Sequence, residues 1–198
     1  MKTKNVLITY AVEQEYTALQ AHGHSVTYLQ TGIGKTQSAH ALTKRILEAR
    51  PDLVLNIGTA GTHAHAVGDI FVANRFVDRD FQAIHLQGLP FEIEGLLFFE
   101  ALPRLKTWID HYERLGLCST GDSFVTQASS HYGDVVDMEA YAQAYVCRDF
   151  AIPFLSVKYV TDVIGQNSVQ HWESKLADAR KGLGAWFEAN RLLAQIAE

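Results

Sequence analysis

Carboxylate side chains follow apolar segments of this 198-residue chain, directly where each segment ends. Glu13 and Glu15 come after the first apolar run, and Asp137 and Glu139 come after a short apolar pair. Asp162 closes the apolar run at residues 153–160. Two carboxyl groups in a partly dry site are pushed to different pKa values, so that one can donate a proton while the other activates water. Such a set suits cleavage of a glycosidic-type bond.

A structural role is the alternative for most of these acids. Glu13, Glu15 and Glu139 precede or begin segments with helical propensity, where a carboxylate stabilises the positive end of the helix dipole. Asp162 has no such explanation, because an acid at the end of a buried strand gains nothing from core packing. Asp162 is therefore the strongest candidate for a catalytic group.

The elements that position these acids alternate between β-rich and helical patterns. Strands are expected at residues 5–11, 25–30, 52–58, 70–76, 116–125, 135–136 and 153–160, and helices at 13–20, 35–49, 139–148 and 172–197. The continuous apolar run at 52–58 is typical of a central strand that is covered on both faces. This alternation predicts an α/β fold with a mixed or parallel sheet. Ligands of such folds bind beyond the carboxyl ends of the strands, where the acids lie.

Length, composition and charge indicate which classes of protein this sequence fits. A length of 198 residues, with 47% hydrophobic and 20% charged residues, favours one globular domain over residues 1–198. The net charge of -5, without a basic run, argues against nucleic acid as a partner. The apolar runs are far shorter than the ~20 residues that span a bilayer, so no membrane association is expected. No signal peptide is evident, which makes the cytoplasm the expected compartment.

Cysteine and histidine do not form a metal-binding pattern. Cys118 and Cys147 lack a partner at metal-ligand spacing and are too few for a disulfide framework, so both are expected to be reduced. His63 and His65 have only Asp69 as a nearby acid. We expect neither a metal nor a cofactor.

Two glycine-containing segments and one aromatic side chain are compatible with ligand binding. Residues 58–61 (GTAG) lack the Lys-Ser/Thr ending of a P-loop and the third glycine of a dinucleotide fingerprint. Residues 32–35 (GIGK) form either an anion-binding turn or a tight connection. Phe124, beside a glycine-containing turn, either stacks on a base or packs in the core. The apolar segment 81–105 is either a buried connection or a wall of a ligand or subunit interface.

Motifs in a fixed order connect these features. They are AVEQE at 11–15, TGIGK at 31–35, NIGTAG at 56–61, VGDI at 67–70, GDSFV at 121–125, DMEA at 137–140 and VKYVTD at 157–162. The ordered set resembles the nucleoside phosphorylase and nucleosidase superfamily, most closely the bacterial 5'-methylthioadenosine/S-adenosylhomocysteine nucleosidases, over residues 5 to about 165. The resemblance implies a three-layer fold with a mixed β-sheet flanked by helices, a homodimer, and hydrolysis of an adenine nucleoside.

The resemblance also implies roles for individual residues. The acid that protonates purine N7 falls on Asp162, and the carboxylate that activates water falls on Glu15. Met138 packs under the ribose, while Glu139 accepts hydrogen bonds from the ribose hydroxyls. These roles agree with the chemistry, because the departing base gains negative charge and the sugar becomes oxocarbenium-like. Asp162 must then hold a proton near neutral pH, which requires burial or a like-charged neighbour.

The remaining site residues follow from the same resemblance. Phe124 stacks on the base, and the backbone of Val125 recognises the adenine edge. Thr59 stands where the family has a serine near the water, and it keeps the hydroxyl group. Lys158 stands where the family has an arginine that orients the water and the ribose acid; lysine keeps the charge but loses the planar fork.

Water is favoured over phosphate as the co-substrate. A phosphorylase needs arginines to hold phosphate, whereas Glu13 and Glu15 would repel it. Arg75 and Arg79 remain candidate anion ligands, so a purine nucleoside phosphorylase is one alternative. Another modified nucleoside such as futalosine is a second, and a catalytically silent nucleoside-binding protein is a third. Two further departures, at residues 76–78 and in a shortened segment before residue 31, bear on substrate identity.

Overall fold

A computed structural model describes residues 2–84, 87–127, 133–166 and 168–196. The strands are β1 (Asn5–Tyr10), β2 (Ser25–Gln30), β3 (Leu53–Thr62), β4 (Ile70–Asp78), β5 (Glu92–Glu94), β6 (Leu115–Thr120), β7 (Val135–Asp137) and β8 (Phe154–Val163). The helices are α1 (Lys35–Glu48), α2 (Arg79–Ile84), α3 (Pro103–Asp110), α4 (Ala140–Asp149) and α5 (Ser168–Asn190), with short 3-10 turns η1 (Glu13–Glu15), η2 (Phe99–Ala101) and η3 (Leu192–Ile196).

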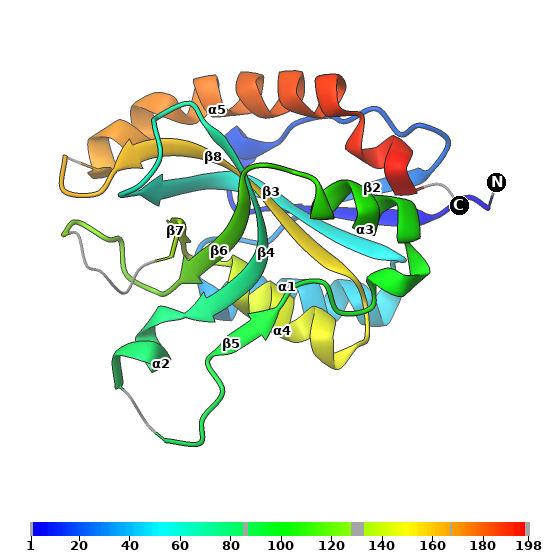
Figure 1. Ribbon diagram of the computed structural model, residues 1–198, viewed down its shortest axis with the longest axis horizontal. Coiled ribbons are helices and arrows are strands. Elements are labelled where there is room, and N and C mark those ends of the chain that lie inside the picture. The colour runs from blue at the N-terminus through cyan, green and yellow to red at the C-terminus, as the bar shows by residue number, and fades with distance from the viewer. Residues whose placement is uncertain (1, 85–86, 128–132, 167, 197–198) are drawn as a thin grey trace.

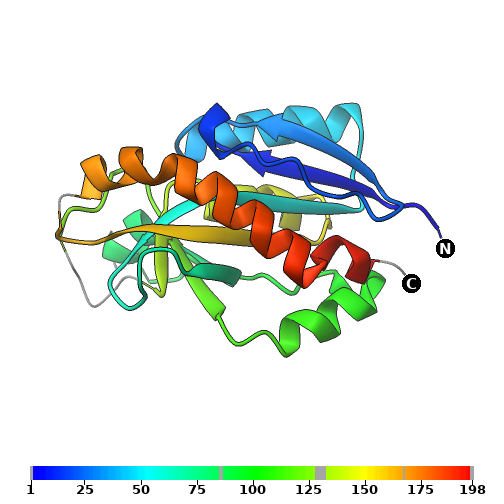
Figure 2. The ribbon, with the colours of Figure 1, turned by 90° about the horizontal axis from the view of Figure 1, so that it is seen from above.

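The sheet lies between two layers of helices (Figure 1). Helix α5 crosses one face, as Figure 2 shows from above, whereas α1 and α4 cover the other. Each face carries its own hydrophobic core: Leu55 and Leu183 belong to the core under α5, and Leu42 and Phe76 belong to the core under α1 and α4. The mixed α/β fold with three layers is therefore confirmed.

Strand β3 is the centre of the sheet, as its apolar sequence predicts. It pairs in parallel with β1 and β8, and antiparallel with β7 through Gly61 and Val136. Strand β8 also pairs with β4, β4 pairs with β6, and β6 pairs with β7, so these pairings close a ring with β3. All residues of β3 are buried. The Gly61–Val136 pair places the short strand β7 beside the carboxyl end of β3.

The prediction of a helix at residues 13–20 is wrong. Only residues 13–15 form a 3-10 turn, and the chain from Tyr16 to His24 is irregular. Tertiary partners satisfy this segment: the Leu19 amide donates to the Tyr28 hydroxyl at 2.7 Å, and the Thr17 hydroxyl donates to the Arg180 carbonyl at 3.4 Å. Helix propensity is a weak preference that such long-range contacts override.

Two other expected boundaries differ from the structure. The strand expected at 116–125 ends at Thr120, and an irregular loop follows. The helix expected at 172–197 begins earlier, at Ser168, and ends at Asn190, because Arg191 takes a left-handed conformation with φ 47° before η3 begins. The other predicted strands and helices are confirmed to within a few residues.

The apolar segment 81–105 divides between core and surface. Ile93 and Phe99 are buried, whereas Phe81, Ile84 and Leu97 are exposed. In the part of the chain that the structure describes, no helix combines the length and the apolar character needed to cross a bilayer.

Candidate active site

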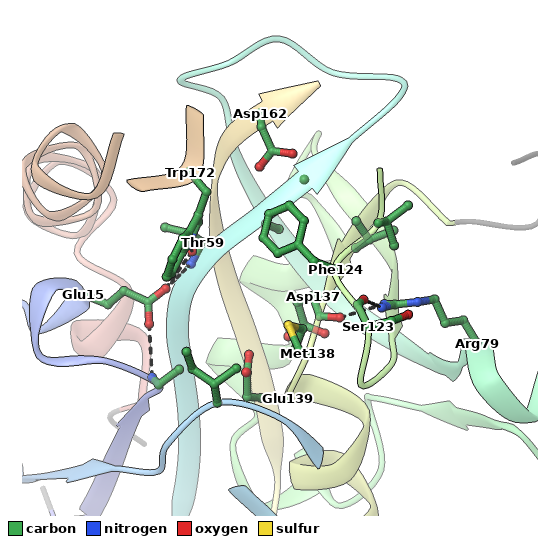
Figure 3. A pocket seen from close by; sticks show the side chains of 16 residues that line it. Glu15, Thr59, Arg79, Ser123, Phe124, Asp137, Met138, Glu139, Asp162 and Trp172 are labelled. Carbon is green, nitrogen blue, oxygen red and sulfur yellow. Dashed lines mark hydrogen bonds between the residues drawn. The ribbon is translucent and has the colours of Figure 1, made fainter. Parts of the chain in front are cut away.

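A cavity of about 310 Å³ lies where the carboxyl ends of β3, β7 and β8 converge with the segments that follow β1 and β6 (Figure 3). It is lined by Ala11, Glu15, Ile33, Thr59, Ala60, Gly61, Arg79, Ser123, Phe124, Val125, Val136, Asp137, Met138, Glu139, Asp162 and Trp172. This is the edge at which an α/β sheet binds its ligands.

The cavity brings together most of the site residues that the sequence predicts. These are Glu15, Thr59, Phe124, Val125, Met138, Glu139 and Asp162. Lys158 is not among the lining residues, since it lies deeper in β8. Trp172 borders the cavity although its sequence position, inside an amphipathic helical pattern, carries no signal for it.

The Glu15 carboxylate is held by donors on both oxygens and is 4% exposed. Its Oε1 accepts from the backbone N–H of Thr59 at 2.9 Å and from the Thr59 hydroxyl at 2.7 Å. Its Oε2 accepts from the backbone N–H groups of Ala11 at 3.1 Å and Val12 at 3.3 Å. A Cβ atom at Gly58 would lie 3.1 Å from Oε1, so the glycine makes room for the carboxylate.

Trp172 extends this arrangement from the first turns of α5. Its indole Nε1–H donates to the Thr59 hydroxyl oxygen at 2.9 Å, and its ring meets Phe124 edge-on at 6.4 Å between centroids. The Thr59 oxygen accepts from the indole through a lone pair, while its own hydrogen donates to Glu15 Oε1. The result is a relay of hydrogen bonds from the helix to the carboxylate (Figure 3).

A β-bulge sets the direction of Asp162. The parallel register of β3 and β8 pairs Ala60 with Val160 and then Gly61 with Asp162, so Thr161 is the extra residue. The Thr161 hydroxyl donates to Asp162 Oδ1 at 2.8 Å. A Cβ atom at Gly61 would lie 2.9 Å from Asp162 Oδ2, so a larger residue there would force the carboxylate out of this position. Asp162 is 2% exposed.

Glu139 and a buried ion pair form the floor of the site. Glu139 Oε1 accepts from the Gly34 N–H at 2.9 Å. Lys158 Nζ lies 2.8 Å from Asp137 Oδ2, with side chains 2% and 1% exposed. Burial and then the negative charge of Asp137 raise the pKa of Glu139 to about 8.

The pKa values of Asp137 and Lys158, the two members of the ion pair, shift in opposite directions. Burial alone would raise the pKa of Asp137, but the charge of Lys158 and the hydrogen bonds from Lys158, Thr120 and the Ala140 amide together hold this pKa below its usual value. Burial would likewise lower the pKa of Lys158, but the negative charge of Asp137, together with smaller contributions from Glu139 and other acidic groups, raises this pKa. Both members of the pair are therefore charged near neutral pH.

Arg79 borders the cavity but is committed to backbone carbonyl groups. Its Nη1 donates to the carbonyls of Ser119 at 3.3 Å and Asp137 at 2.8 Å. Its Nη2 donates to the carbonyl of Gly121 at 3.1 Å and to that of Ser123. The expectation that this side chain is available as an anion ligand is therefore not supported by its geometry.

Arg75 differs from Arg79 in its exposure. It lies on β4 and binds the Glu92 carboxylate through Nε at 3.1 Å and through Nη2. It does not border the cavity. Among the residues that the structure describes, no group of three or more His, Cys, Asp or Glu side chains is arranged to hold a metal ion.

Comparison with known proteins identifies the family of this chain. A family model described as the phosphorylase superfamily matches residues 6–185. The chain belongs to the phosphorylase superfamily. A relative in this superfamily, the 5'-methylthioadenosine/S-adenosylhomocysteine nucleosidase of Geobacillus sp. (strain WCH70), is 30% identical over 186 residues, which cover 84% of this chain and 80% of the relative. The enzyme of the same name from Lysinibacillus sphaericus (strain C3-41) is 29% identical over 196 residues, covering 89% of this chain and 85% of the relative.

Solved structures of superfamily members have the same fold. The S-adenosylhomocysteine nucleosidase of Streptococcus pyogenes, in complex with 5-methylthiotubericidin, superposes with a TM-score of 0.81 at 22% identity and covers 100% of this chain and 99% of its own. The nucleosidase of Colwellia psychrerythraea 34H, in complex with adenine, gives a TM-score of 0.78 at 23% identity and covers 98% of this chain and 96% of its own. The resemblance inferred from the motifs is thereby confirmed for family and fold.

Proposed function

We propose that this superfamily member is a purine nucleosidase that hydrolyses the N-glycosidic bond of an adenine nucleoside. The observation that carries the proposal is the convergence of Glu15, Glu139 and Asp162 on one cavity of about 310 Å³ beside the aromatic ring of Phe124. The curated relatives are named for hydrolysis of 5'-methylthioadenosine and S-adenosylhomocysteine, and this supports an adenine nucleoside with a 5'-thio substituent as the substrate.

In the proposed reaction Asp162 is the general acid and Glu15 is the general base. The C1'–N9 bond breaks and its electron pair moves to the purine, which takes a proton at N7 from Asp162. Water adds to C1' and gives a proton to Glu15. Burial favours the protonated form of a carboxyl group, and Asp162 is buried. Proton transfer to the leaving base typically contributes ~10²–10⁴-fold to the rate.

The other lining residues bind the substrate in this proposal. Phe124 stacks on the base and the backbone of Val125 contacts its edge. Met138 packs under the ribose, and Glu139 binds the ribose hydroxyls.

Water is the proposed co-substrate, because no described arginine next to the cavity has its terminal nitrogens free for phosphate. Arg79 donates to backbone carbonyls, and Arg75 binds Glu92 at the surface. Phosphorolysis predicts base release that depends on phosphate, whereas hydrolysis predicts equal rates in its presence and absence. A panel of 5'-modified and ordinary purine nucleosides, with futalosine included, identifies the preferred substrate.

The decisive experiment is the Asp162→Asn variant. It keeps the volume but removes the transferable proton, so kcat should fall by about 10²-fold or more. The matched control is Asp178→Asn, which changes an exposed aspartate of α5 that pairs with Lys175. If Asp162→Asn keeps near-normal kcat, the assignment fails. If the wild-type protein binds nucleosides but releases no base, it is a silent binding protein instead.

We further propose that residues 1–198 act as one catalytic domain, in the cytoplasm, and as a homodimer. Exposed apolar side chains of the segment that follows β4 support the dimer: Phe81, Ile84, Leu89 and Leu97. Large apolar side chains that are exposed in a free subunit are often covered at an interface when they gather in a patch. A monomer in sedimentation at micromolar concentration would contradict the dimer.

A further inference from the structure

The segment that would hold the base has no regular structure of its own. We call residues 121–127, which follow β6 and include Phe124 and Val125, the base loop; they form neither helix nor strand. A loop without a hydrogen-bond ladder keeps its shape through contacts with other parts of the chain. The contacts of the base loop therefore decide where Phe124 and Val125 lie.

Arg79 provides two of these contacts. Its side chain enters from α2 and is 6% exposed, and its guanidinium reaches the carbonyls of Gly121 and Ser123 in the base loop (Figure 3). The same guanidinium reaches the carbonyl of Asp137, directly before Met138. One planar group thus connects the segment that would hold the base with the segment that would hold the ribose.

Close packing around Gly121 is an independent sign that the loop is fitted to this arginine. A Cβ atom at Gly121 would lie 2.7 Å from Arg79 Nε and 2.7 Å from Asp80 Oδ1. Contacts this short do not occur for real Cβ atoms, so only glycine allows the loop to approach Arg79 as it does.

The neighbour of Arg79 makes a second connection to the base loop. Asp80 Oδ2 accepts from the backbone N–H of Asp122 at 3.1 Å and from Lys35 Nζ at 2.7 Å. Asp122 Oδ1 in turn accepts from the backbone N–H of Lys35 at 2.7 Å. Residue 34, one position earlier, is the donor to Glu139. The start of α2 therefore anchors the base loop and the glycine turn together.

We propose that Arg79 is a positioning residue for base recognition: it holds the backbone of the base loop in the conformation that presents Phe124 and Val125 to the purine. The inference rests on the proposed function, since it assumes that the cavity takes a purine. It assigns Arg79 no contact with phosphate and no part in bond cleavage. Its effect should therefore fall on binding of the base more than on the chemical step.

The test compares Arg79→Met and Arg79→Lys with Arg75→Met, which removes an arginine from the preceding strand. Arg79→Met should raise the Kd for free adenine, measured by calorimetry, and the KM for the nucleoside by about 10-fold or more, the effect of losing one well-formed buried hydrogen bond. The value of kcat should change by less than about threefold, because the guanidinium of Arg79 donates to backbone carbonyls and takes no part in the proposed proton transfers. Arg75→Met should leave all three quantities unchanged.

Hydrogen exchange separates positioning from a general structural role. In Arg79→Met the amides of residues 121–127 should exchange faster while those of β3 and β8 keep the wild-type rate. Arg79→Lys keeps the charge but concentrates its donors on one atom, so its Kd should lie between those of the wild type and Arg79→Met. It also serves as the test if Arg79→Met does not fold.

Three results would overturn the proposal: adenine binding within about threefold of wild type in both Arg79 variants, unchanged exchange in the base loop, or faster exchange spread through the sheet. If the wild-type protein neither binds adenine nor releases base, the proposed function fails and base recognition fails with it. Exchange in the base loop then still decides whether Arg79 holds the loop.

Discussion

The buried ion pair beneath the site makes a quantitative prediction about Lys158. In Lys158→Met the apolar volume is kept, but Asp137 loses the ammonium group 2.8 Å from its Oδ2. It keeps the donors from the Thr120 hydroxyl at 2.5 Å and the Ala140 amide at 2.9 Å. Because both charged side chains are at most 2% exposed, solvent cannot replace the lost partner. Breaking such a buried pair from one side costs about 3–5 kcal/mol.

That loss is large against a total stability of about 5–15 kcal/mol for a typical domain. Urea denaturation at pH 7, followed by circular dichroism, measures it. The double variant Lys158→Met with Asp137→Asn removes both charges and should recover most of the loss, since a neutral pair leaves no unpaired charge buried. Lys175→Met, at an exposed ion pair of α5, is the matched control and should change stability by less than about 1 kcal/mol.

Two results would refute this reasoning. One is a loss below about 1 kcal/mol in Lys158→Met, which would mean that the carboxylate is solvated or neutral. The other is a double variant that is no more stable than Lys158→Met, which would mean that the lysine acts through packing and not through charge.

Three further perturbations test other parts of the structure. The pKa of Glu139 is raised to about 8, so the folded protein binds more protons than the unfolded chain. The stability that this group contributes is therefore lost as the pH rises toward 8. Urea midpoints measured at pH 5.5 and 8.5 should differ less in Glu139→Gln than in the wild type. Trp172→Phe keeps an aromatic side chain but removes the donor to Thr59, which should lower kcat by up to about 10-fold and have no further effect in a Thr59→Val background. Burial raises the pKa values of the Cys118 and Cys147 thiols, so mass spectrometry should find neither alkylated by iodoacetamide at pH 8 until the protein is denatured.

Much of the fold could be predicted because its signals are local. The apolar run at 52–58 identifies β3, and Leu42 and Ile46, at helical spacing, lie on the buried face of α1. Glu15 and Asp162 could be found in the same way, since each follows an apolar strand. The order of strands follows from pairings between distant segments, and no local pattern shows them.

What the sequence could not predict depends on contacts between distant residues. The hydrogen bond from Trp172 to Thr59 joins residues 113 positions apart, and nothing in the helical pattern around Trp172 distinguishes it from a core residue. Arg79 likewise has the composition of an anion ligand, and only the carbonyls around it reveal its different use. The irregular chain after Glu15 was missed for the same reason, because its partners lie on β2 and α5.

The glycines of β3 show how one pattern can indicate opposite chemistries. As a sequence, residues 58–61 are compatible with a loop that cradles an anion. In the structure the absence of Cβ atoms at Gly58 and Gly61 is used by carboxylates: added Cβ atoms would lie 3.1 Å from Glu15 Oε1 and 2.9 Å from Asp162 Oδ2. An anion such as phosphate at the same place would meet Glu15, which already accepts from the Thr59 amide that an anion would need. The glycines that first suggest phosphate binding are therefore part of the argument for water.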